Sequence, residues 1–141
     1  MSRLIASRKR LLRVRHAQHS QAVAAVMSAR DEASQITENA RRIALVRDEL
    51  IGNEGATTGA LLASKRELAT RLERAGRQLD GALYDANRRI DQRDAERVVA
   101  GRDREIAERL KDKAHAAREA RREARLAALP SYRRMQDRGT E

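Results

Sequence analysis

The stretch that decides the fold is Ile51–Gly59, IGNEGATTG, which holds three of the seven glycines of the chain. Gly and Asn break regular structure, so this stretch is the strongest loop signal present. Ser2–Leu50 contains neither Gly nor Pro, and after the loop Pro130 is the only proline. Long helices therefore flank the loop, and Pro130 stops the second one. We predict one coiled-coil hairpin over residues 1–141, with a helix at about 2–50, a loop at about 51–59, a helix at about 60–129 and a frayed tail at 130–141. Thr57 or Thr58 is expected to cap the second helix.

Both predicted helices carry a heptad stripe, in which spacings of three and four residues alternate. Such stripes run along one side of a helix and favour a left-handed supercoil. The fold class predicted is therefore all-α, a long antiparallel two-helix coiled coil. The first stripe is Ala22, Val26, Ala29, Ala33, Ile36, Ala40, Ile43, Arg47 and Leu50; the second is Leu61, Lys65, Leu68, Leu72, Ala75, Leu79, Leu83, Ala86 and Ile90.

Folding the chain back at Gly55 predicts a register for this hairpin. Most layers then place a small residue opposite a large one, which lets two helices interdigitate without voids. The predicted pairs are Leu50 with Leu61, Arg47 with Lys65, Ile43 with Leu68, Ala40 with Leu72, Ile36 with Ala75, Ala33 with Leu79, Ala29 with Leu83, Val26 with Ala86, and Ala22 with Ile90.

The same register makes two further predictions. Arg15 and His19 should lie opposite Arg97 and Arg93, where like charges would loosen the hairpin. Beyond them, apolar contacts resume where Leu11, Leu12 and Ile5 meet Val98, Val99 and Ile106. The second helix should have no partner from Leu110 onward, so that its last part, Lys111–Leu129, forms a C-terminal helical overhang.

The composition agrees with a helical rod and excludes several classes of protein. The chain lacks Phe, Trp and Cys, and 37% of its residues are charged. Alanine buries little area, so a thick globular core is not expected. Without Cys there is no disulfide framework and no thiolate metal site. No apolar run approaches the roughly 20 residues that span a bilayer, and no apolar block follows the basic N-terminus. We expect a cytoplasmic protein without a cleaved signal.

Catalytic and cofactor sites are not expected in this sequence. His16 and His19 stand three residues apart, but no acidic residue is suitably spaced beside them to complete a metal site. A two-helix rod offers no concave pocket in which to desolvate a catalytic group. The Gly52–Gly59 stretch lacks the Lys-Ser/Thr of a phosphate-binding loop. The sequence therefore predicts a protein that is not an enzyme and holds no cofactor and no metal.

The net charge of +10 raises the alternative of an anionic partner such as nucleic acid. No aromatic residues interleave with the arginines to stack on bases, and the heptads fold back rather than fork as in a dimeric zipper. The chain is therefore expected to bind nucleic acid in a non-specific, salt-sensitive way only. Lys111–Leu129 has too few bulky apolar residues for a membrane-surface helix.

The chain resembles the FliJ-type stalk proteins of the flagellar type III export apparatus and their injectisome relatives. The likeness lies in chain size, the Leu/Arg-rich start LIASRKRLLRVR at Leu4–Arg15, the loop after roughly fifty residues, and the charged C-terminal helix. The resemblance implies a small cytoplasmic antiparallel hairpin, peripheral to the inner membrane through its protein partners. Those partners would be a hexameric export ATPase, the cytoplasmic domain of the export gate, and other export chaperones.

The resemblance also implies which residues would contact these partners. The family's gate-binding face begins with an apolar residue, a Leu and an Ala at spacings matched by LATRLERAGRQL, although Leu79 stands where the family has a histidine. The expected gate-binding residues are Asn39, Ile43, Val46, Leu50, Leu68, Leu72, Ala75 and Leu79; the last four also fall on the heptad stripe, so they are alternatively hairpin core. The expected ATPase-binding residues are the basic side chains near both chain ends: Arg8, Arg10, Arg13, Arg118, Arg121, Arg122 and Arg125. The alternatives are a solvated basic face on a general coiled-coil adaptor, or a nucleic-acid-associated helical protein.

Overall fold

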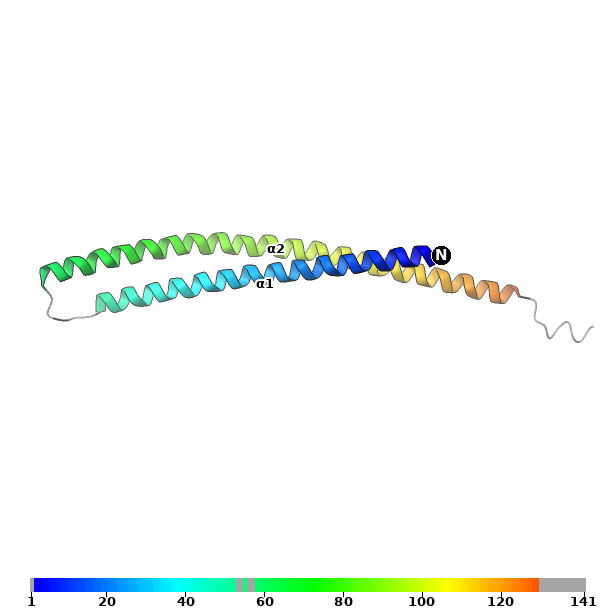
Figure 1. Ribbon diagram of the computed structural model, residues 1–141, viewed down its shortest axis with the longest axis horizontal. Coiled ribbons are helices and arrows are strands. Elements are labelled where there is room, and N and C mark those ends of the chain that lie inside the picture. The colour runs from blue at the N-terminus through cyan, green and yellow to red at the C-terminus, as the bar shows by residue number, and fades with distance from the viewer. Residues whose placement is uncertain (1, 53–54, 56–57, 130–141) are drawn as a thin grey trace, which may run out of the picture. The chain divides into compact units, whose positions relative to one another are not determined.

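The computed structural model of the chain describes residues 2–52, 55 and 58–129. It contains two long α-helices, α1 (Ser2–Gly52) and α2 (Gly59–Ala128), packed against each other as a helical hairpin (Figure 1). The predicted all-α hairpin class is confirmed. The predicted frayed tail at 130–141 lies outside the described residues.

The ends of the helices follow the sequence signals closely. Thr58 caps α2, because its Oγ1 accepts a hydrogen bond of 3.3 Å from the backbone N–H of Leu61. This confirms one of the two residues predicted as the cap. α2 ends at Ala128, two residues before Pro130 in the sequence, as expected from the steric conflict between proline and a preceding helical residue. α1 continues through Ile51 and Gly52, slightly further than predicted.

The contacts divide the chain into two units. The terminal unit contains Met1–His19 and Ala100–Glu141, and the loop unit contains Ser20–Val99. Both helices cross from one unit to the other without a break in their helical backbone. The prediction of a single domain stays a prediction.

In the loop unit, one stripe of each helix faces the other helix. The buried residues are Val26, Ala29 and Ala33 on α1 and Ala86 on α2. Each of the nine stripe residues predicted on α1 is buried or half-buried. On α2, however, Leu61 and Leu68 are 50% and 46% exposed, although both were placed on the stripe. Their exposure shows that α1 does not cover the start of α2.

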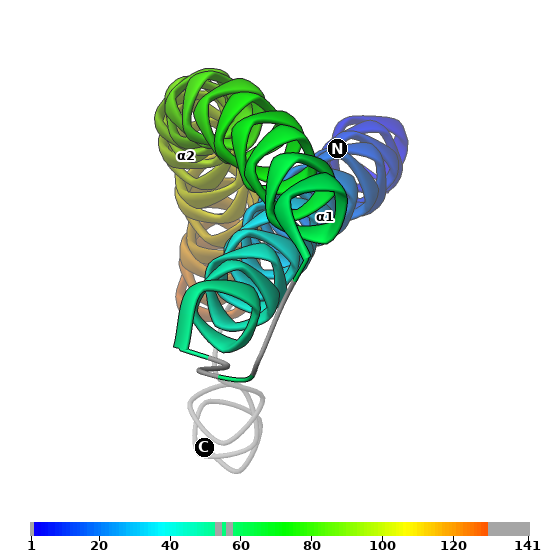
Figure 2. The ribbon, with the colours of Figure 1, turned by 90° about the vertical axis from the view of Figure 1, so that its left-hand side faces the viewer.

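The register of the loop unit is shifted from the prediction by about one heptad. Arg89 pairs with Glu32 across the helices, with 3.8 Å between Nη2 and Oε2, whereas the predicted pairs place Glu32 next to Leu79. The first two turns of α2 consequently project beyond the end of α1 (Figure 1). Seen from the loop end, the last turns of α1 and the first turns of α2 are separate neighbouring cylinders (Figure 2). A slide of seven residues superimposes a heptad stripe on itself, so the pattern alone could not fix the register.

The terminal unit shows the same shift. Arg15 Nη1 lies 3.1 Å from Asp103 Oδ2 and 3.0 Å from Gln18 Oε1, and the imidazole of His19 packs on Gly101. The predicted like-charge contacts of Arg15 and His19 with Arg97 and Arg93 are therefore wrong. Arg97 and Arg93 instead pair with Asp94 and Glu96 of their own helix.

The apolar contacts predicted toward the chain ends are also corrected. Val98, Val99 and Ile106 are exposed, and the described side chains buried in the terminal unit are Ile5, Ala107 and Ala114. The half-buried residues of α2 extend to His115, so the part of α2 without cover begins at Ala116 and not at Leu110. The overhang is real but about one turn shorter than predicted, because the shifted register brings more of α2 alongside α1.

Candidate functional site

The last turns of α2 carry a basic surface that no other described part of the chain covers. Every residue from Ala116 to Leu129 is exposed. A shallow hollow on this helix has cationic and apolar walls, which we name the Arg118 surface; it is lined by Arg118, Arg121, Arg122, Arg125, Leu126 and Leu129. Leu126 and Leu129 are 58% and 65% exposed.

Helical spacing explains why these side chains gather. Arg118, Arg122 and Arg125 follow one another at four and three residues, which places them on one side of the helix, with Leu129 one turn further. Among the described residues, the one carboxylate within ion-pair range of these arginines is Glu119, 3.9 Å from Arg122 Nη1. Glu119 and Glu123 lie on the same stretch of helix, so the surface carries a net positive charge beside two apolar side chains.

The basic residues near the N-terminus are less uniform than predicted. Arg10 and Arg13 are exposed, whereas Arg8 is half-buried against the seam of the terminal unit. Two α2 cations, Arg104 and Lys111, are half-buried there as well, and Arg104 Nε is buried without a hydrogen-bond acceptor among the described residues. The seam of the terminal unit is thus itself cationic, a feature that the sequence pattern did not reveal.

A second candidate surface is a groove between the helices of the loop unit, which we name the Asn39 groove. It is lined by Asn39, Arg42, Ile43, Ala75, Gln78, Leu79 and Ala82. Four of the eight residues expected to bind an export gate, Asn39, Ile43, Ala75 and Leu79, therefore line one groove. Val46 and Leu68 are exposed, while Leu50 and Leu72 are half-buried in the seam.

The residues expected to bind an export gate can be hairpin core and partner surface at the same time. Ile43, Leu72, Ala75 and Leu79 are all half-buried, so each contacts the opposite helix and keeps part of its surface open. A two-stranded coiled coil leaves such flanks exposed because two helices cannot enclose their own seam. A partner helix can therefore use these side chains without the hairpin opening.

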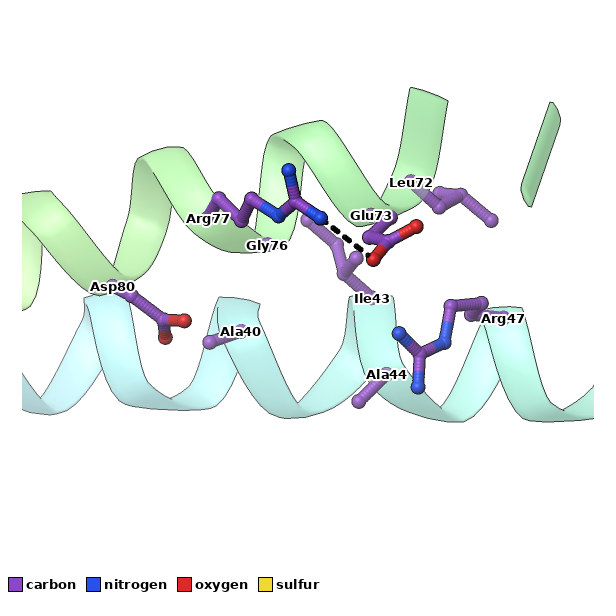
Figure 3. Close-up of a pocket in the computed structure, with 9 residues that line it drawn as sticks. All are labelled: Ala40, Ile43, Ala44, Arg47, Leu72, Glu73, Gly76, Arg77 and Asp80. Atoms are coloured by element: carbon purple, nitrogen blue, oxygen red, sulfur yellow. Dashed lines mark hydrogen bonds and ion pairs between the residues drawn. The ribbon is translucent and has the colours of Figure 1, made fainter. Parts of the chain in front are cut away.

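A further groove of the loop unit, which the sequence reading missed, lies around Gly76 (Figure 3). We name it the Gly76 groove; it is lined by Ala40, Ile43, Ala44, Arg47, Leu72, Glu73, Gly76, Arg77 and Asp80. The one signal of this groove in the sequence was Arg47 on the heptad stripe, because a charged residue at a seam position seldom packs without a polar neighbour.

Neither a metal site nor a membrane span is found in the described part of the chain. No group of three or more His, Cys, Asp or Glu side chains within residues 2–52, 55 and 58–129 is arranged to hold a metal ion. Over the same residues, neither helix has a segment apolar enough to cross a bilayer.

Comparison with known proteins adds no assignment. No protein-family model matches the chain, and neither a curated protein nor a solved structure is significantly similar to it.

Proposed function

We propose that this chain is a partner-binding stalk component of a flagellar-type type III export apparatus, and that the Arg118 surface docks on acidic residues of the export ATPase hexamer. The observation that carries the proposal is the uncovered helix from Ala116 to Ala128, with four arginines against two carboxylates, Glu119 and Glu123. The resemblance of the whole chain to FliJ-type proteins supplies the identity of the partner. The protein acts by binding and carries out no reaction itself.

The chemistry of the Arg118 surface fits an acidic protein partner. Guanidinium groups bind carboxylates through two parallel hydrogen bonds, which gives both geometry and affinity. Leu126 and Leu129 supply apolar area next to them, so binding does not depend on charge alone. Long-range attraction between a chain of net charge +10 and an acidic pore would also speed association.

The Asn39 groove is the surface we propose for the second partner, the cytoplasmic domain of the export gate. Its half-buried apolar side chains, Ile43 and Leu79, lie between the polar Asn39 and Gln78. A central apolar strip with a polar rim is the usual anatomy of a docking site for a helix. Through these two contacts the protein would stay in the cytoplasm and reach the membrane only by way of its partners.

The proposal is tested by the ATP hydrolysis rate of the cognate export ATPase with and without this protein, near physiological salt. The triple variant Arg118→Glu, Arg121→Glu and Arg122→Glu should lose both stimulation and co-elution with the ATPase, because three attractive contacts become repulsive. The matched control is Arg30→Glu, Arg41→Glu and Arg66→Glu, which changes net charge equally at exposed positions of the loop unit. The control should bind and stimulate like the natural sequence.

Three results would count against the proposal in different ways. Full stimulation by the Arg118 triple variant would remove the Arg118 surface from the ATPase contact. Equal loss in both triple variants would reduce the interaction to net charge. No stimulation and no co-elution by the natural sequence would favour a general coiled-coil adaptor. In that event, tight binding to nucleic acid that collapses with added salt would favour the nucleic-acid alternative.

A further inference from the structure

The Gly76 groove has a floor that another helix can approach closely. Ala40 and Ala44 line it from α1 and Gly76 lines it from α2. A Cβ atom built on Gly76 would have nothing within 4 Å, so there is open space above its backbone. Small side chains at a helix crossing allow short distances between the helix axes.

The charged residues of this groove alternate in sign along its length (Figure 3). Asp80 lies at one end and Arg77 comes next; Gly76 is in the middle, Glu73 follows, and Arg47 of α1 lies at the other end. Arg77 Nη2 and Glu73 Oε1 are paired within α2 at 3.0 Å. The two arginines and two carboxylates make the groove neutral overall, unlike the chain as a whole.

This order of charges is self-complementary under a two-fold rotation. Reversing the groove about Gly76 places Arg47 over Asp80 and Glu73 over Arg77, so that every charge meets its opposite. In an isologous interface the same patch is used by both subunits, and self-complementarity of this kind is what such an interface requires. We propose that the Gly76 groove binds the same groove of a second copy of the chain, with Arg47 of each copy paired to Asp80 of the other.

The surroundings of the Arg47 side chain support its pairing with a carboxylate from a second copy. Its Nη2 is 3.9 Å from the neighbouring Asp48, at the limit of an ion pair, and its Nε is buried without an acceptor among the residues that the structure describes. A buried donor without an acceptor is costly, and a carboxylate held near the guanidinium offsets that cost. The side chain of Arg47 is still 42% exposed, so the carboxylate of a second copy can reach the guanidinium.

The distribution of charge on the chain supports a second copy as the molecule that binds the Gly76 groove. Two chains of net charge +10 repel each other over most of their surfaces. A neutral patch that alternates in sign is where repulsion is least and specific pairing greatest. Self-association through this groove goes beyond the proposed export function and uses none of the arginines of the Arg118 surface, so either proposal can fail alone.

The test is sedimentation velocity of the full chain over a wide range of concentration, near physiological salt. We expect the natural sequence to pass from monomer to dimer as concentration rises. Asp80→Arg and Arg47→Asp, each alone, place two like-charge pairs in the interface and should weaken the dimer by about tenfold or more. An equimolar mixture of the two variants should recover dimerisation as a heterodimer, because both pairs across that interface are again attractive.

Asp85→Arg and Arg41→Asp are the matched controls, since they change net charge identically at exposed positions outside the groove. Circular dichroism checks that all variants remain helical. A natural chain that stays monomeric throughout overturns the proposal and leaves the groove to another protein. Dimers that survive the single substitutions, or a mixture that does not recover, overturn it as well.

Discussion

The two units hold the same two helices together with different mixtures of apolar and charged contacts. The seam of the loop unit is built mainly from alanine, valine, isoleucine and leucine at heptad spacing, with half-buried Arg47 and Lys65 near the loop; among the described residues, one exposed ion pair crosses it, Arg89 to Glu32. The seam of the terminal unit contains Ile5, Ala107 and Ala114 but also half-buried Arg8, Arg104 and Lys111, and its cross-helix ion pair, Arg15 to Asp103, is shorter. Repeated apolar layers stabilise the pairing of α1 with α2 in the loop unit, but they do not fix its register. The polar contacts of the terminal unit fit one alignment, and slipping would break them.

The register of the loop unit can be tested directly because the chain has no cysteine. We expect cysteines replacing Glu32 and Arg89 to be joined in high yield by a short bifunctional thiol reagent. Cysteines replacing Glu32 and Asp80, which the predicted register would bring together, should react poorly. Asp80 lies about 13 Å further along the helix axis than Arg89, at 1.5 Å per residue. Mass spectrometry of the joined peptides measures both yields, and equal yields would mean that the seam slides between registers.

Matched substitutions at two buried alanines of α2 compare the seams themselves. Ala86→Asp in the loop unit should cost about 2–4 kcal/mol of unfolding free energy, because its carboxylate is buried among apolar layers. Ala107→Asp should cost roughly half as much, since Arg104 and Lys111 lie one turn away on the same side of the helix. Urea unfolding followed by circular dichroism measures both values. Equal costs would contradict the view that the terminal seam is cationic.

The smallest expected effect concerns the two cross-helix ion pairs. A double-mutant cycle with Arg15→Ala and Asp103→Ala should give a coupling energy of about 0.5–1 kcal/mol, because these side chains are only 36% and 39% exposed. The same cycle for Arg89 and Glu32, which are more exposed and 3.8 Å apart, should give nearly zero. A larger coupling in the loop unit would reverse our assignment of which seam fixes the register.

Much of this fold could be predicted from local signals. The glycines of Ile51–Gly59 mark the turn, Thr58 caps α2, and alternate spacings of three and four give the inward side of α1 throughout the loop unit. Register could not be predicted, because a heptad stripe matches itself after a shift of seven residues. The residues that break this degeneracy, Arg15 and Asp103, are charged and 88 positions apart, so no periodic pattern links them.

The candidate surfaces were predictable to different degrees. The Arg118 surface follows from composition and helical spacing on one helix, so its clustering needed no tertiary information. The Asn39 groove needed the pairing of two helices, and the shifted register changed which of its expected residues meet. The Gly76 groove depends on alanine and glycine leaving space next to Arg47, and empty space has no signature in a linear sequence.

The shifted register also bears on the order in which the hairpin folds. α1 is synthesised first and must keep its apolar stripe unpaired until α2 emerges. Contacts beside the loop close the shortest segment of chain, so pairing is expected to start in the loop unit and proceed toward the chain ends. A pairing that begins one heptad out of register is nearly as stable at first. It is less stable than the native pairing only once the chain ends come together, because Arg15 then cannot pair with Asp103. The terminal unit would then add a small further preference for the native register, since this one ion pair is expected to contribute about 0.5–1 kcal/mol.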